Sequence, residues 1–563
     1  MRVRRRIDGL LLALCLLVSG GCATYGDELG QALALADAGD FHAARANLSG
    51  VLDPEGDERL LYRLEKGALA HMQGDYRASI NHLLAAEQIG EDLYTRYFTD
   101  AIRSALSHPR NAPYRGTIYE LAYIHYYQAL NFTALAQASD NRIERRDNLD
   151  AALVEVRKLD ARLNELSYQE GDYSELGSNG QQRRMAVMLR AFHGFSSEIA
   201  DRDSLRFREA AWLRYLSGVL YEMAGDLDDA RIAYQRAAEL YESGYAEQFD
   251  LDRDMVRQAW QDAYRLAWLT GLWPGVESEA RQRLSEPELD EILASRIGDA
   301  QLLLVEHVGR LPPRGELNLV MYADRFRRSV TLRPMHVGTH EEQLWQDAWF
   351  RTLYADTGPL GMLLHYRQGG VDGLVRGHFE KSFYVGGLWS DLDNLGVLDP
   401  MSGGVRVTVP YPGPPPLPVS VSRVSVNGES HRLTTVDDIA RMSHQDLLLN
   451  AGEELRRAAA RELFRHALAE LAARELEEEG GLLGALLGAA ARVGTSASAR
   501  ADTRAWQTLP AEIRLLRMRL PAGEHELRLG RGEFLPGSER PRQETTVVLA
   551  PGEIRLLQSR RMN

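Results

Sequence analysis

Three aspartates between residues 391 and 399 come closest to a metal-binding loop. Asp391, Asp393 and Asp399 occupy the first, third and ninth positions of a calcium loop, and Gly396 occupies the sixth. A leucine stands at the fifth position, and Ser402 replaces the bidentate glutamate of the twelfth. We therefore expect a polar turn here and no calcium site.

Two histidines four residues apart are the second arrangement that could carry metal chemistry. On a helix, His336 and His340 would place two imidazoles on one face, as zinc sites can use. Pro334 and Gly338 argue against a regular helix, and no third ligand is marked nearby. The sequence predicts a pair of loop histidines and no metal.

Motifs for catalysis are missing from the sequence. It contains no Gly-x-Ser-x-Gly elbow, no phosphate-binding glycine loop and no His-Glu-x-x-His helix. Carboxylate pairs are plentiful in an acidic chain, and none stands out by its position. We predict a protein that is not an enzyme and that needs no cofactor.

The chemistry that the sequence does mark is lipidation of Cys22. A basic start with four arginines precedes the apolar run Leu10 to Val18, and the small residues Ser19 to Gly21 stand directly before the cysteine. This is the order of a secretory signal, and its apolar run is shorter than the roughly 20 residues that span a bilayer. A cysteine after small residues resembles the bacterial lipobox, whose sulfur carries acyl chains of the palmitate type. Ala23, in place of an inner-membrane retention aspartate, favours the outer membrane.

Cysteine count and charge fit an anchored periplasmic protein. Cys15 lies inside the expected signal peptide, residues 1–21, so no cysteine remains to pair with Cys22 in a disulfide. The chain has a net charge of −14, and removing the signal, which carries +3, leaves about −17. An acidic body does not favour nucleic acid as a partner.

A helical repeat is the clearest signal in the body of the chain. The spacing from Gly218 to Ala237 matches the tetratricopeptide (TPR) pattern, in which small residues let two helices approach and a Gly-Asp pair separates them. Similar spacing recurs around Gly39, Gly74 and Gly271. We predict a TPR-like α-solenoid over residues 22–298. The residues expected to pack it are Gly67, Gly74, Tyr76, Gly218, Tyr221, Gly225, Ala230, Tyr234 and Ala237.

Strand patterns dominate the rest, so the expected fold class is α+β and multidomain. Residues 299–410 form a mixed, divergent region, and residues 411–418 form a proline-rich connector. Residues 419–563 should contain a hairpin turning at Asn427-Gly428, a long helix from Asp437, and terminal strands. We expect these strands to form a small β-sandwich packed against the long helix.

Several stretches resemble an uncharacterised family of bacterial TPR-containing outer-membrane lipoproteins. The resemblance is carried by residues 19–25, 113–116, 127–131, 501–510 and 521–525. It implies an envelope location and the order of repeats followed by a mixed C-terminal part. The family has no established activity to carry over, and residues 325–400 diverge from its pattern.

Two polar clusters and one apolar segment have more than one interpretation. Tyr114 with Arg115 and Arg504 with Trp506 are candidate interaction residues, because exposed arginine beside an aromatic ring can form a binding hot spot. A structural role, locking loops onto helix ends, is the favoured alternative. The segment 482–491 could contact a membrane, but we expect a helix under the terminal sheet.

The sequence leaves three functions open. The first is a lipid-anchored periplasmic scaffold that binds an envelope protein partner through its repeats. The second is an envelope enzyme, such as a cell-wall hydrolase, with its site in residues 325–400. The third is a permanent structural subunit of a secretion or surface assembly. A repeat groove filled by the chain itself would weaken the peptide-binding form of the first.

Overall fold

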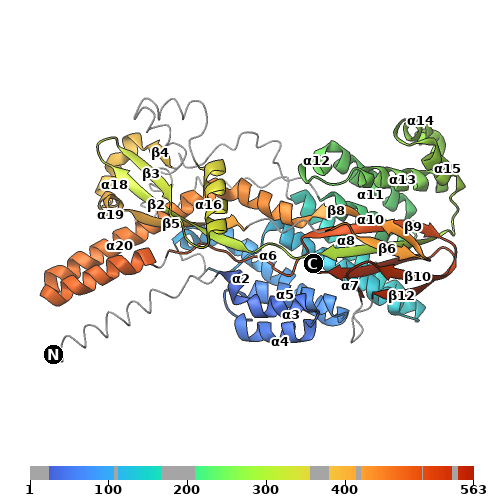
Figure 1. Ribbon diagram of the computed structural model, residues 1–563, viewed down its shortest axis with the longest axis horizontal. Helices are drawn as coiled ribbons and strands as arrows, with labels where there is room; N and C mark the ends of the chain where they lie inside the picture. The colour runs from blue at the N-terminus through green and yellow to red at the C-terminus, as the bar shows by residue number, and fades with distance from the viewer. Residues whose placement is uncertain are drawn as a thin grey trace.

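The computed structural model describes residues 24–106, 112–165, 210–354, 380–413, 420–497, 499–535 and 543–562. Helices and sheets are both abundant, so the α+β class is confirmed. The predicted signal peptide and Cys22 lie outside the described residues. Figure 1 shows the two sheets formed by the C-terminal strands at one end of the molecule, and a third sheet with a long helix at the other.

The first half is helical. Its elements are α2 (Tyr25–Glu28), α3 (Gly30–Asp37), α4 (Phe41–Val51), α5 (Arg59–Met72), α6 (Tyr76–Leu106), α7 (Ile118–Ala138), α8 (Arg142–Glu165), α10 (Ala211–Ala224), α11 (Leu227–Leu240), η4 (Tyr241–Tyr245), α12 (Ala246–Gln248), α13 (Asp254–Leu269), α14 (Trp273–Arg283) and α15 (Glu286–Ala294). Capping boxes begin several of them; Thr117, for example, accepts a hydrogen bond from the Glu120 amide while the Glu120 side chain reaches back.

Four helical hairpins turn at the glycines that the repeat spacing marked. Gly39, Gly74, Gly225 and Gly271 all have φ between +79° and +88°, a region that favours glycine. They join α3 to α4, α5 to α6, α10 to α11, and α13 to α14. The local chemistry of the turns was therefore predicted correctly.

The small residues of the repeats allow close helix packing. A Cβ on Gly67 would lie 2.7 Å from the Leu83 side chain, and a Cβ on Gly218 would lie 2.6 Å from the Tyr234 ring. The other predicted packing residues contribute to the same interior. Ala230, Tyr234 and Ala237 are fully buried, Tyr76 is 7% exposed, and Tyr221 is partly buried against the core.

The second half contains three sheets. Its elements are β1 (Ala300–Val308), β2 (Arg314–Asp324), β3 (Ser329–Pro334), α16 (His340–Leu353), β4 (Lys381–Tyr384), η5 (Gly386–Leu388), α18 (Trp389–Asn394), α19 (Leu398–Ser402), β5 (Val405–Pro412), β6 (Arg423–Val426), β7 (Glu429–Arg432), β8 (Thr434–Asp438), α20 (Ile439–Ala497), β9 (Glu512–Leu520), β10 (Gly523–Leu529), β11 (Glu533–Leu535), β12 (Glu544–Leu549) and β13 (Ile554–Arg561). Sheet A has the order β11-β13-β1-β9-β8, sheet B β4-β3-β2-β5, and sheet C β12-β10-β6-β7.

Strand β1 at the centre of sheet A was not expected. It pairs in parallel with β13 and antiparallel with β9. All nine residues are buried, because one face packs on the helices through Leu303 and Val305, and the other packs on sheet C through Leu302 and Leu304. A strand buried on both faces has no alternating pattern, which is why the sequence did not reveal it.

The long helix does not pack where it was expected. Sheets A and C share a core, as a two-sheet sandwich requires. Helix α20 instead buries Leu455, Ala459 and Leu463 against sheet B. The expectation that the helix packs against the terminal strands holds only for its first turns, where Ile439 and Met442 share a core with Ile513 of β9. The cores on sheet B and between sheets A and C both take residues from before and after the connector 411–418.

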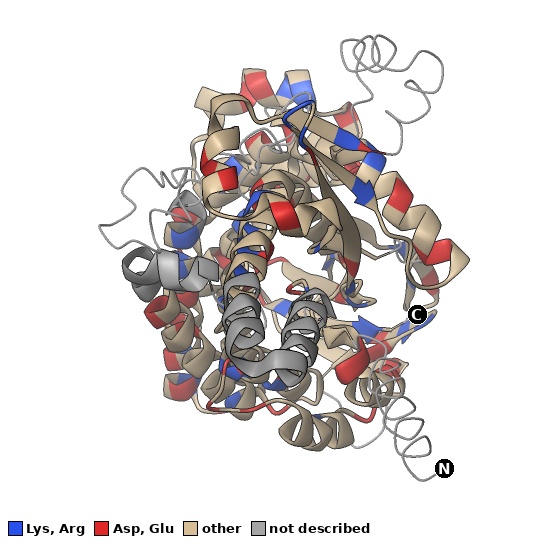
Figure 2. Cartoon of the chain, turned by 90° about the vertical axis from the view of Figure 1, so that its left-hand side faces the viewer, with Lys and Arg blue, Asp and Glu red and all other residues tan. Residues whose placement is uncertain are grey.

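The helices and the charged positions of the described residues bear on a possible membrane span. Among the described residues, none of the helices combines the length and apolar character needed to cross a bilayer. Figure 2 shows acidic and basic positions mixed over the end of the molecule that carries sheet B and α20. The interspersed charges agree with the acidic composition of the chain.

We predict that Gly218→Ala lowers the free energy of unfolding by about 1 to 3 kcal/mol, because the new methyl group meets the ring of Tyr234 in a tightly packed hairpin. Urea unfolding checks this. The matched control is Gly50→Ala, where a helical glycine has open space around its Cβ position and substitution should leave stability unchanged or slightly higher. Equal effects at the two positions would contradict the packing argument.

Candidate functional site

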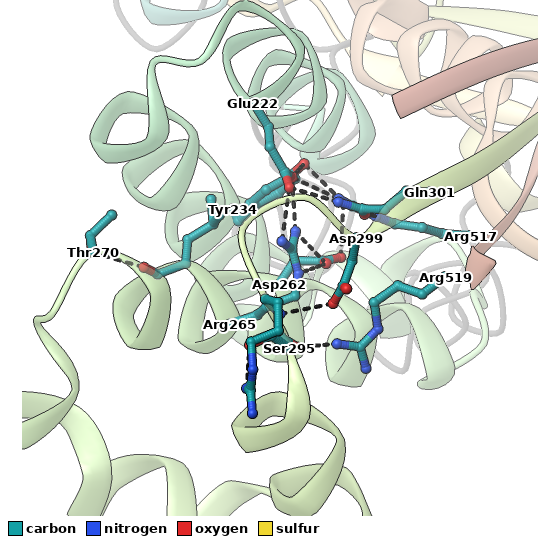
Figure 3. Close-up of polar contacts among 12 residues, drawn as sticks. Glu222, Tyr234, Asp262, Arg265, Thr270, Ser295, Asp299, Gln301, Arg517 and Arg519 are labelled. Carbon is teal, nitrogen blue, oxygen red and sulfur yellow. Dashed lines mark hydrogen bonds and ion pairs between the residues drawn. The ribbon is translucent and has the colours of Figure 1, made fainter. Parts of the chain in front are cut away.

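Four buried charges close a ring where the helices meet sheet A (Figure 3). Arg265 of α13 lies 2.8 Å from Glu222 of α10 and 3.2 Å from Asp262. Arg517 of β9 completes the ring, 2.7 Å from Glu222 and 3.1 Å from Asp262. All four side chains are at most 7% exposed. The alternating signs make the ring neutral, which offsets the large cost of burying each charge.

Hydroxyl and amide groups fix the orientation of the ring. Tyr215 donates to Asp262 over 2.6 Å, and Tyr234 donates to Glu222 over 2.9 Å. Gln301 of β1 donates to Glu222 and accepts from Arg517 over 2.7 Å. The repeat residue Tyr234 therefore has two roles: its aromatic side chain packs on Gly218, and its hydroxyl donates to the Glu222 carboxylate.

Glu222 and Arg517 remain ionised near neutral pH. Burial would raise the pKa of Glu222, but the charges of Arg265 and Arg517 outweigh burial and lower that pKa below its usual value. Burial opposes the charge of Arg517 as well, and the carboxylates, Asp262 first, raise its pKa above the usual value. Groups held this firmly in one protonation state are poorly suited to exchange protons near pH 7, so the ring fits positioning or binding.

A polar cavity of about 310 Å³ adjoins the ring. Its walls come from α13, α15, β1 and β9, and Asp262, Arg265, Arg517 and Gln301 form part of them. Its volume is at the lower end of the range for small-molecule sites. Among the four ring residues and their hydrogen-bond partners, the sequence had singled out only Tyr234. The others were missed because the ring joins segments almost 300 residues apart.

The predicted interaction cluster lies mostly in the interior. Tyr114 is 6% exposed, Arg504 1% and Trp506 0%, while Arg115 is half-buried. The guanidinium of Arg504 lies 5.5 Å from the centre of the Tyr114 ring and donates to the backbone oxygen of Ala112 over 2.9 Å. Tyr114, Arg504 and Trp506 therefore cannot form an exposed hot spot. Their packing fits the alternative role, in which they lock a loop onto a helix end.

Two buried glutamates that the sequence analysis missed hold the same segment. Glu120 of α7 accepts a hydrogen bond from the backbone N–H of Trp506 over 2.7 Å. Glu65 of α5 accepts the N–H groups of Gln507 and Thr508 over 2.7 and 3.1 Å. The position of Glu65 on its helix could have indicated that it is buried. It lies on the same helix face as buried apolar residues three and four positions away.

The metal-like patterns do not assemble in the described residues. His336 lies before α16 and pairs with Asp347 at 2.7 Å, whereas His340 begins that helix. In the aspartate loop, Arg325 pairs with both Asp393 and Asp399. Within the expected polar turn, residues 391–394 belong to the short helix α18, residues 395–396 form a turn, and residues 398–399 begin α19.

One cluster of possible metal ligands was not anticipated. Glu87, His125 and Glu155 bring their ligand atoms within 4.8 Å of one another. The ammonium of Lys158 already lies 3.0 Å from Glu87 and 3.1 Å from Glu155. A lysine cation therefore takes the place where a metal would neutralise the carboxylates, and the cluster is explained as an ion-pair network.

We predict that Arg517→Met lowers the free energy of unfolding by about 3 to 5 kcal/mol, because Glu222 and Asp262 lose one of their two buried cations. Urea denaturation measures the loss. The control is Arg528→Met, which removes the exposed Arg528–Glu544 pair and should cost less than about 1 kcal/mol. A loss of that small size at Arg517 would show that the ring does not hold the halves together.

A second prediction concerns pH. Burial is the main cause that raises the pKa of Glu65 from 4.5 to about 7, so the folded state binds this proton more tightly than the unfolded state. The associated stability is present below about pH 4.5 and is lost as the pH rises through about 7. Glu65→Gln lacks this contribution. Between about pH 4.5 and 7, the free energy of unfolding of wild type should therefore fall by about 3 kcal/mol relative to that of the variant.

Urea unfolding of both proteins at several pH values tests the prediction by difference. The exposed Glu55→Gln serves as control and should follow wild type at every pH. A constant difference between wild type and Glu65→Gln would contradict the assignment.

No protein-family model matches this chain, and neither the curated proteins nor the solved structures include a match. The resemblance to TPR-containing lipoproteins therefore stays a prediction from the sequence.

Proposed function

We propose that this chain is a lipid-anchored outer-membrane protein that faces the periplasm and binds an envelope protein partner without catalysing a reaction. The basic start, the apolar run and Cys22 support the anchor. The four glycine-turned hairpins support a TPR-like solenoid as the framework. Membrane attachment would come from the acyl chains on Cys22, and no cofactor is needed.

The observation that carries the proposal is the burial of Tyr25. Its side chain is fully buried, its backbone N–H donates to Thr503 over 3.1 Å, and its hydroxyl donates to Glu65 over 3.4 Å. Only three residue steps separate Cys22 from this fixed point, which corresponds to about 10 Å of extended chain. An acylated Cys22 would therefore hold the folded body close to the membrane surface.

The face of the helices that a free TPR array could offer to a peptide is occupied by the chain itself. Residues from α5, α7, α10 and α13 share one core with β1, β9 and the segment carrying Trp506. The form of the hypothesis in which the repeat groove grips a partner peptide loses support. We place the partner contact elsewhere.

Sheet B offers the alternative surface. Seven of the eighteen exposed large apolar side chains in the described residues lie between positions 322 and 384: Tyr322, Phe326, Met335, Val337, Leu344, Trp345 and Tyr384. Phe326, in the turn between β2 and β3, is 97% exposed, and Tyr384 in β4 is 70% exposed. Phe326 precedes β3 by three residues, and Tyr384 pairs with Ser329 at the start of that strand, so these two exposed side chains lie at the same end of sheet B. Exposed apolar side chains gathered in this way support a protein-binding surface.

The other two functions have less support. For an enzyme in residues 325–400, the described part of this region has Asp393 and Asp399 paired with Arg325, and the polar cavity beside the ring is lined by other segments. A permanent structural subunit would share the anchor and the apolar surface, and it would differ by a fixed stoichiometry with its partner.

We predict that in-cell crosslinking followed by affinity purification from membranes recovers one envelope complex with wild type and loses it with Cys22→Ser. The substitution removes only the sulfur that would carry the lipid, so the variant should keep the wild-type melting temperature and leave the membrane fraction. The double substitution Phe326→Ser with Tyr384→Ser should stay on the membrane and lose the partner.

A matched control is Ile143→Ser with Val548→Ser, which removes two exposed apolar side chains far from sheet B in the sequence. It should retain the partner. Retention by the Phe326 and Tyr384 variant would reject sheet B as the contact, and failure of wild type to enter the membrane fraction would reject the anchor.

A further inference from the structure

The polar cavity beside the ring has a lining unlike an ordinary packing defect. Eleven residues line it: three arginines, three carboxylates, three glutamines, Ile292 and Met518. Empty packing defects are apolar, whereas a cavity of about 310 Å³ with this lining holds water or a polar solute. The formal charges of the lining cancel.

The inner wall is rigid. Arg265 and Arg517 each bridge Glu222 and Asp262, and both guanidinium groups are almost completely buried. Gln258 adds a hydrogen bond to Asp262 over 2.9 Å. Opening the ring would leave buried charges unpaired, so a ligand would meet this wall as a fixed, neutral, polar surface.

The outer wall can exchange partners. Arg519 is 23% exposed and pairs with Glu291, whose side chain is 62% exposed, and it also donates a hydrogen bond to the Ser295 hydroxyl. An ion pair with one solvent-exposed partner contributes little to stability. Glu288 also lines the cavity and accepts the backbone N–H of Ser285 over 2.7 Å. The mouth therefore presents one guanidinium beside two carboxylates, and the Arg519–Glu291 pair can open at small cost.

Charge balance and the absence of aromatic rings narrow the class of ligand. A dianion or dication would pair with only one sign of charge in a lining that carries both signs equally. A sugar would find no stacking surface, because no aromatic side chain is among the cavity's described lining residues. We propose that the cavity binds a small zwitterion of the amino-acid type, with its carboxylate on Arg519 and its ammonium on Glu288 and Glu291. This binding is independent of the proposed anchor and protein partner.

Isothermal titration calorimetry on the full chain tests the proposal with glycine, L-alanine and L-glutamine as probes. At least one should bind, and Arg519→Gln and Glu291→Gln should each raise its Kd about tenfold, as expected for the loss of one charge-assisted hydrogen bond. Both residues lie outside the ring, so both variants should fold. The matched control Arg528→Gln removes an exposed ion pair on sheet C and should bind like wild type.

Ligand analogues separate the two ends of the zwitterion. Glycinamide lacks the carboxylate and N-acetylglycine lacks the ammonium, so each should bind at least tenfold more weakly than glycine or not at all. Glucose tests the neutral alternative. The proposal is overturned if no amino acid binds, if glucose binds in their place, or if Arg519→Gln and Glu291→Gln leave binding unchanged.

Discussion

The ring of Arg265, Arg517, Glu222 and Asp262 is the interaction on which the arrangement of the two halves depends. Three of its members come from the helices and one comes from strand β9. Without Arg517, the helices would bury two carboxylates against a single cation, at a cost of several kcal/mol. The helical array therefore needs the C-terminal strands to reach its stable form. We infer that the two halves fold as one cooperative unit.

Buried acidic side chains also join the two halves at other contacts. Glu65 and Glu120 on the helices accept backbone N–H groups from residues 506–508. In the opposite sense, Asp437 of β8 accepts hydroxyl hydrogen bonds from Tyr123 and Tyr245 on the helical side. Each contact places a buried polar group opposite a partner distant in the sequence, which fixes the register of strand against helix more firmly than apolar packing alone.

The parts of the fold that the sequence predicted are those determined by neighbouring residues. Glycines at Gly39 and Gly225 mark hairpin turns because a positive φ is a local requirement, and Asn427-Gly428 marks the β6–β7 turn for the same reason. Strand β1 depends on partners more than 200 residues away, and its short apolar run from Leu302 to Val305, between Gln301 and Glu306, shows no alternating strand pattern. Glu65 could be seen only as an acid on an apolar helix face, because the backbone N–H groups of Gln507 and Thr508 that donate to it lie more than 400 residues further along.

The contacts of the helices explain why function cannot be read from the repeats alone. In a free TPR array, the covered face would be available to another protein's peptide. Here the chain's own strands and the loop at Trp506 satisfy that face with hydrogen bonds and ion pairs that a partner would have to break. A partner would gain little by displacing them, because each buried carboxylate it exposed would need a new cation or donor. The binding that we propose costs less at the exposed aromatic side chains of sheet B, where no internal contact must break, and in the cavity, where a single outer ion pair has to open.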